Sequence, residues 1–110
     1  MDGGEVSNPK RRYPRAHYGG WVEIASGDRR RVARGRDLCA TGLGVSMTAP
    51  HPAAGALIES EFSLPGLALP VAATARVVWS DPGSGVLGLH FTRLDPAVAE
   101  LLENFVEGWL

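Results

Sequence analysis

The hydrophobic positions of the chain follow two periods, and the change between them separates a region of strands from a final helix. Between residues 18 and 91, apolar and polar residues alternate over short stretches, as in strands with one buried face. After residue 95, apolar residues recur every three or four positions, which is the period of an amphipathic helix. The pattern therefore predicts several short strands followed by one helix.

Turn-forming residues divide the alternating region into six predicted strands. The first runs from Tyr18 to Ala25, with Val22 and Ile24 on one face and Trp21 on the other. The second strand runs from Arg29 to Asp37, and the third is marked by Leu43, Val45 and Met47. The fourth has Ile58, Phe62 and Leu64 on its inward face. The fifth runs from Leu69 to Trp79, with both of these residues on the inward face, and the sixth runs from Val86 to Phe91. Residues 38–42 join the second and third strands, and Asp81 to Ser84 turn the fifth into the sixth.

The predicted helix has a clear start. The carboxylate of Asp95 can accept from amides of the first turn, and Pro96 occupies the first helical position without losing a needed donor. Strands with turn-length links pair antiparallel, so we expect an all-β fold, a six-stranded antiparallel barrel with a C-terminal helix. The helix can cover an open end of the barrel or present its apolar face to another chain.

Length and composition restrict the classes of protein that fit. The chain has 110 residues, so we expect a flexible lead-in over residues 1–9 and one folded domain over residues 10–110. Cys39 is the single cysteine and the three histidines are scattered, which excludes an internal disulfide and a structural zinc site. No stretch approaches the roughly 18 apolar residues of a membrane helix. We therefore expect a cytoplasmic protein with no cofactor, no metal and no membrane insertion.

The net charge of -1 conceals an asymmetry along the chain. Residues 1–36 contain nine of the eleven Lys and Arg against four acidic residues, whereas residues 37–110 contain two against eight. A basic front end on an acidic body predicts a small anionic ligand rather than DNA or RNA, which needs a basic face across the domain. An aromatic content of 7% also argues against a single-strand nucleic-acid groove.

Two short segments contain the candidate chemistry. The first has Arg11, Arg12 and Arg15, whose planar guanidinium groups suit phosphate and the O6 and N7 edge of guanine. The second runs from Asp37 to Gly42; its carboxylate can accept from the N1 and N2 donors of guanine. Gly42 permits either close backbone approach to a ligand or a positive φ. Taken separately, the first segment is compatible with a solvated basic run, and the second with a turn that Asp37 caps.

Taken together, the two segments resemble the signature of the PilZ domain family, RxxxR followed by (D/N)xSxxG. Arg11 and Arg15 match the first motif, and Asp37 and Gly42 match the ends of the second. The resemblance extends over Lys10 to Leu110 and implies a bacterial receptor domain for cyclic di-GMP. It implies that Arg11 and Arg15 hold phosphate and guanine edges while Asp37, Cys39 and Gly42 take the guanine, with Arg12 and Lys10 as auxiliary contacts. A downstream protein partner is also implied.

Cys39 departs from the family pattern, which has serine at this position. A thiol is a weaker hydrogen-bonding group than a hydroxyl, so we expect binding to be weakened by about three- to tenfold. Two alternatives remain: a PilZ-like module for protein–protein interaction with weak or no nucleotide binding, and an enzyme that pairs Cys39 with His17, His51 or His90. We expect no enzymatic activity. We also expect Lys10 to Arg15 to become ordered when the ligand binds.

Overall fold

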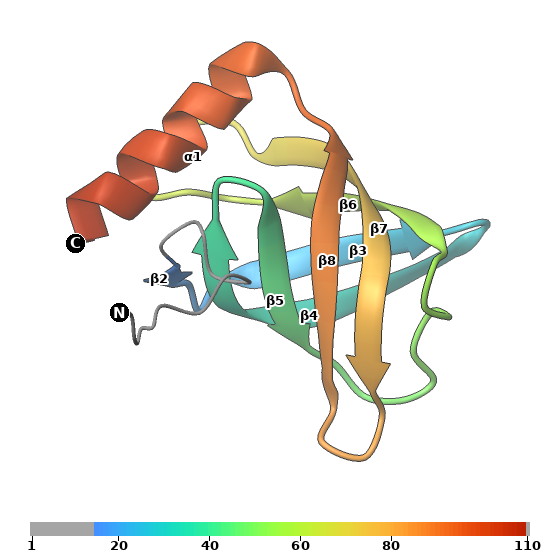
Figure 1. Cartoon of the computed structure of the whole chain (residues 1–110). Helices are drawn as coiled ribbons and strands as arrows, with labels where there is room; N and C mark the ends of the chain where they lie inside the picture. The colour runs from blue at the N-terminus through green and yellow to red at the C-terminus, as the bar shows by residue number, and fades with distance from the viewer. Residues whose placement is uncertain (1–14, 110) are drawn as a thin grey trace, which may run out of the picture.

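The chain forms a closed antiparallel barrel with a helix across one end, as a computed structural model shows for residues 15–109 (Figure 1). The elements are β2 (Ala16–His17), β3 (Trp21–Ser26), β4 (Arg29–Cys39), β5 (Gly42–Ser46), β6 (Leu57–Phe62), β7 (Val71–Asp81), β8 (Val86–Arg93) and α1 (Pro96–Trp109). The strand order is β4-β3-β6-β7-β8-β5, and β5 pairs with β4 to close the ring. The predicted six-stranded barrel is confirmed, with β2 as an additional strand on β4.

The barrel closes around one apolar core because alternate residues of every strand point inward. Val22 and Ile24 of β3, Leu43 and Val45 of β5 and Phe62 of β6 are almost completely buried. The rings of Phe62 and Phe91 stack with centroids 6.2 Å apart. Each large side chain of this kind contributes on the order of 1.5–3 kcal/mol on burial, so the alternating pattern is enough to choose the inner face.

The first strand is interrupted where a single strand is predicted. β2 and β3 pair with the same side of β4, and their registers differ by one residue across Tyr18 to Gly20. Tyr18 turns inward at the break, where its hydroxyl donates to the carbonyl oxygen of Ser63 at 2.5 Å. A side chain at Gly20 or Gly35 would collide with the tyrosine ring. His17 lies in β2, before the break.

The inward positions predicted for Leu69 and Trp79 in the fifth strand are wrong. Leu69 lies before β7 and is 78% exposed, and Trp79 is 49% exposed although the alternation places it inward. β7 has an irregular register between Val77 and Trp79 opposite β8. An extra residue in one strand shifts every later side chain to the other face, so Trp79 points outward.

Strand β4 is longer than predicted, and the connection to β5 is correspondingly shorter. β4 continues to Cys39, and Ala40 and Thr41 alone form the turn in place of residues 38–42. Asp37 consequently lies within a strand, paired with His17 and Gly44, and does not cap a turn.

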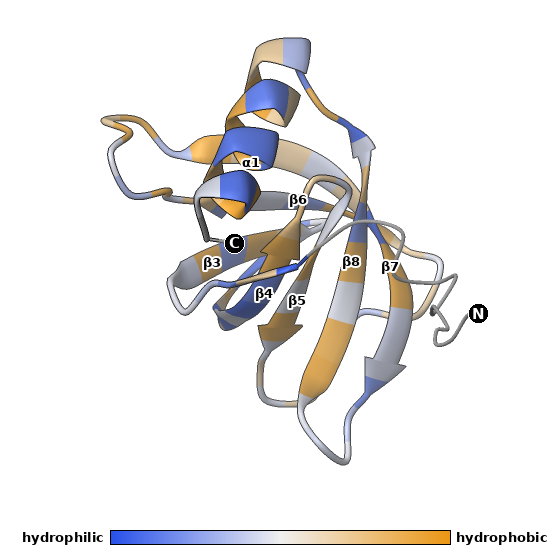
Figure 2. Ribbon diagram, turned by 60° about the vertical axis from the view of Figure 1, so that its left-hand side comes forward, coloured by the Kyte–Doolittle hydropathy of each residue, from blue (hydrophilic) through white to orange (hydrophobic). Residues whose placement is uncertain are grey.

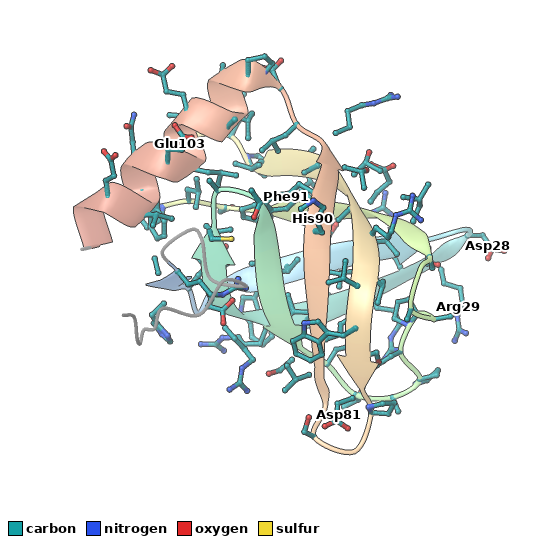
Figure 3. The ribbon with its side chains drawn as sticks, in the orientation of Figure 1. Asp28, Arg29, Asp81, His90, Phe91 and Glu103 are labelled. Carbon is teal, nitrogen blue, oxygen red and sulfur yellow. The ribbon has the colours of Figure 1, made fainter. Side chains whose placement is uncertain are left out.

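Helix α1 begins as predicted. The Oδ1 atom of Asp95 accepts a hydrogen bond from the amide of Ala97 at 2.8 Å, which satisfies a first-turn donor. Leu102 and Val106 are buried, and Phe105 meets Tyr18 edge to face at 6.4 Å. Hydrophilic residues alternate with hydrophobic ones along the helix (Figure 2), and Glu103 points away from the barrel (Figure 3). Among the described residues, no helix is long and apolar enough to span a membrane.

Candidate ligand-binding site

Arg15 and Asp37, which are 22 positions apart in the sequence, form an ion pair on the outer face of the barrel. Both Nε and Nη2 of Arg15 donate to Oδ1 of Asp37, at 3.1 and 2.6 Å. The two side chains are 31% and 40% exposed, so solvent reaches both groups. Since both bonds fall on Oδ1, the second carboxylate oxygen remains available to a ligand donor.

An irregularity in β4 explains why Asp37 points outward. The register with β5 shifts between Gly35 and Asp37, so the barrel interior takes Gly35 and Leu38 while Arg36 and Asp37 face out. Such bulges reorient side chains next to functional sites. The alternation of β4 alone places every second residue outward and therefore does not predict two consecutive outward residues.

The environment of Arg15 keeps its guanidinium charged. Partial burial lowers the pKa of Arg15, but the hydrogen bonds and the negative charge of Asp37 outweigh it, so the net pKa is raised. The site therefore offers a fixed cation beside a carboxylate. A ligand that has both an anionic group and hydrogen-bond donors can use both.

Cys39 lies under Arg15 on the same outer face as Asp37. Its thiol is 3.7 Å from Nη1 of Arg15 and 3.4 Å from the hydroxyl of Thr41, and the residue is buried. Cys39, which stands where the PilZ pattern has serine, therefore lies directly beside the Arg15–Asp37 ion pair.

Gly42 serves the packing of the barrel and does not adopt a positive φ. The glycines with positive φ are Gly27, Gly55, Gly66 and Gly85 among the described residues. At Gly42 a side chain would collide with the backbone carbonyl of Leu89 on β8. The close approach that the sequence predicts is therefore present, but it is an approach between neighbouring strands.

Trp79, whose outward position the sequence pattern missed, lies beside the candidate site. Gly44 pairs with Asp37 on one side and with Gly88 on the other, and Gly88 pairs with Trp79. A Cβ at Gly44 would lie 2.8 Å from Oδ1 of Asp37, and a Cβ at Gly88 would collide with the indole of Trp79. The carboxylate and the indole therefore cover two adjacent glycines. The signal in the sequence is the pair of outward glycines, which leaves room for large side chains from neighbouring strands.

The structure brings together Arg15, Asp37 and Cys39, with Gly42 at the end of the adjacent strand. Arg11, Arg12 and Lys10 lie outside the described residues. The expected ordering of Lys10 to Arg15 on ligand binding stays a prediction. His51 lies in the connection between β5 and β6, where its ring forms hydrogen bonds with the Ser80 hydroxyl at 2.7 Å and the carbonyl of Met47 at 2.9 Å. His90 is exposed on β8 (Figure 3).

Comparison with family models places the chain in a known family. The PilZ domain model matches residues 9–108, and the chain belongs to the PilZ family. No curated protein sequence matches it.

Solved structures show the same fold at low sequence identity. The inhibitor of motility MotI/DgrA from Bacillus subtilis aligns with a TM-score of 0.77 and 17% identity over 89% of this chain and 50% of that one. The PilZ domain of Escherichia coli YcgR, solved with c-di-GMP, gives 0.70 and 18% over 91% of both chains. The PilZ domain of CeSA from a cellulose-synthesizing bacterium gives 0.67 and 21% over 86% and 95%. The chain thus spans about half of the first relative and nearly all of the other two domains.

Proposed function

We propose that this protein is a cytoplasmic receptor for cyclic di-GMP that passes the signal to a protein partner and has no enzymatic activity. The observation that carries the proposal is the contact of Arg15 with both Asp37 and Cys39, because it joins the two segments that match the family motifs. The YcgR domain, whose structure contains c-di-GMP, supports the choice of ligand.

Arg15 and Asp37 have complementary roles in this proposal. Arg15 keeps unused guanidinium N–H groups that donate to a phosphate oxygen or to O6 and N7 of guanine. Oδ2 of Asp37 accepts from N1 and N2 of guanine, two donors that adenine does not present together. Because Arg15 and Asp37 hold each other in place, fewer side-chain rotamers have to be fixed on binding, which lowers the entropic cost.

Trp79 supplies an aromatic face beside the carboxylate. Its indole lies over Gly88, next to the glycine that Asp37 covers, and about half of it is exposed. An aromatic ring adjacent to a hydrogen-bonding carboxylate suits a flat base, because stacking contributes about 1–3 kcal/mol per base. We include Arg11, Arg12 and Gly42 in the proposed site because they lie in the two segments that match the family motifs.

Two observations weigh on the alternatives. Cys39 is buried and its thiol contacts Arg15 and Thr41, which disfavours an accessible nucleophile. Trp21 is 64% exposed on β3 and gives a module for protein–protein interaction a plausible contact surface. That alternative predicts a folded protein without nucleotide binding.

Calorimetric titration with cyclic di-GMP tests the proposal. We expect saturable heat with the unaltered protein, binding weakened at least about 30-fold with Arg15→Ala, and unchanged binding with Arg30→Ala. Arg30 is a matched control because it also pairs with a carboxylate, Glu23 at 3.2 Å, but on the β3–β4 hairpin. Absence of heat with the folded, unaltered protein would overturn the receptor assignment in favour of the interaction module.

A further inference from the structure

A groove of about 420 Å³ lies on the outer face of β4, directly beside the Arg15–Asp37 pair. Asp37 forms one of its walls, so the groove adjoins the proposed nucleotide site. Its other polar side chains are those of His17, Arg34, Arg36 and Ser46, and part of its lining is the backbone of Gly19 and Gly35. β4 is strongly hydrophilic over this region (Figure 2).

Neutral groups orient the two arginines of the groove. The Nε atom of Arg34 donates to the carbonyl of Gly19, and its guanidinium lies 4.7 Å from the ring centroid of Trp21. The Nη1 atom of Arg36 donates to the hydroxyl of Ser46 at 3.3 Å. Neither contact cancels the positive charge. Within residues 15–109, the ion pairs formed by arginine belong to Arg15 and Arg30.

Two other arginines of β4, Arg30 and Arg31, bind groups outside the groove. Arg31 donates to the backbone carbonyls of Thr48 and Pro50 and to the Thr48 hydroxyl, so its guanidinium is engaged with the following loop. Arg30 is neutralised by Glu23. Each guanidinium has five N–H donors, and the described contacts of Arg34 and Arg36 occupy one apiece. These two residues therefore present charge and donors toward the groove.

The chemistry of this set fits a phosphate group. Residues two apart on a strand lie about 6.6 Å apart on the same face, so two long guanidinium side chains can close around one phosphate. The hydroxyl of Ser46 adds a donor, and Gly19 is half-buried, so part of its backbone stays accessible. The charge of Asp37 would repel an anion, but Arg15 compensates it at 2.6 Å.

We propose that Arg34 and Arg36 form a second phosphate-binding subsite next to the nucleotide site. The groove and the contacts of the two arginines support this subsite independently, whereas a role for it in cyclic di-GMP recognition rests on the proposed function. Its phosphate has two possible sources: the second phosphate of a cyclic dinucleotide already held at Asp37, or a phosphate ester on a separate molecule.

Titration of the full chain with inorganic phosphate at constant ionic strength tests the subsite. The readout is the chemical shift of the arginine Nε–Hε signals, assigned by substitution. We expect saturable shifts at Arg34 and Arg36. The apparent affinity should be at least about tenfold weaker in each single variant, Arg34→Gln read at Arg36 and Arg36→Gln read at Arg34. Arg93→Gln removes an exposed arginine at the end of β8 and should leave the titration unchanged.

A second titration, with cyclic di-GMP at saturation, separates the two sources. If the bound ligand itself shifts the Arg34 and Arg36 signals and abolishes the response to phosphate, the subsite holds the second phosphate of that ligand. If the response persists, it holds a separate molecule. Shifts that do not saturate, or an affinity that is unchanged in both single variants, overturn the proposal. Saturable phosphate shifts without cyclic di-GMP binding would instead overturn the proposed function and leave the subsite standing.

Discussion

Replacing Arg15 by alanine should separate ligand binding from stability, because the ion pair with Asp37 is partly solvated. The side chains are 31% and 40% exposed, and pairs in such surroundings contribute about 0.2–1 kcal/mol to folding. For a domain of this size, that loss lowers the melting temperature by at most about 8 °C. We therefore expect Arg15→Ala to remain folded.

The loss of affinity should be much larger than the loss of stability. A hydrogen bond to a charged group contributes about 1.5–3 kcal/mol, and the planar guanidinium of Arg15 can make two to one phosphate or guanine edge. Because such bonds are not additive, we take about 2–4 kcal/mol for the side chain, which corresponds to roughly 30- to several-hundred-fold in the dissociation constant.

Calorimetry and thermal unfolding on the same samples measure the two effects. Arg30→Ala removes an ion pair of similar type, whose partners are 74% and 55% exposed, and should change neither affinity nor stability appreciably. Arg15→Ala that binds cyclic di-GMP as tightly as the unaltered protein would refute the assignment of this residue. A melting temperature lowered by far more than the stated range would show that the pair is chiefly structural.

Three further predictions follow from the same contacts. Cys39→Ser restores a hydroxyl 3–4 Å from Arg15 and Thr41 and should tighten cyclic di-GMP binding about three- to tenfold by calorimetry; weaker binding would contradict the role assigned to this position. Gly42→Ala places a methyl group against the Leu89 carbonyl and should destabilise the barrel by about 1–3 kcal/mol in denaturant unfolding, whereas Gly108→Ala, in open space on α1, should be neutral or stabilising. Burial raises the pKa of Tyr18 above its unfolded value of about 10, so the neutral phenol stabilises the fold fully below that pH and progressively less as pH rises through the folded pKa. Unfolding measured across alkaline pH should show this decline, and Tyr18→Phe should flatten it; an unchanged slope would exclude Tyr18 as its source.

Much of the fold follows from the order of residues alone. Burial of Val22, Ile24 and Phe62 agrees with the alternating pattern, and the Asp95 cap agrees with local hydrogen-bond chemistry. Local patterns predict such features because the inner face of a strand and the first turn of a helix depend on neighbours within a few residues. The family motif likewise groups Arg15 with Asp37, and the structure places the two side chains in contact.

Other features depend on which strands become neighbours. The outward positions of Trp79 and Asp37 arise from register shifts opposite β8 and β5, and the pattern of a single strand carries no information about its partners. The groove beside Arg34 and Arg36 likewise needs β2, β4 and β5 to be placed together. The sequence by itself thus determined the strands, the helix and the chemistry available. Only tertiary pairing decided which groups share a surface, because contacts between distant segments depend on register as well as on residue type.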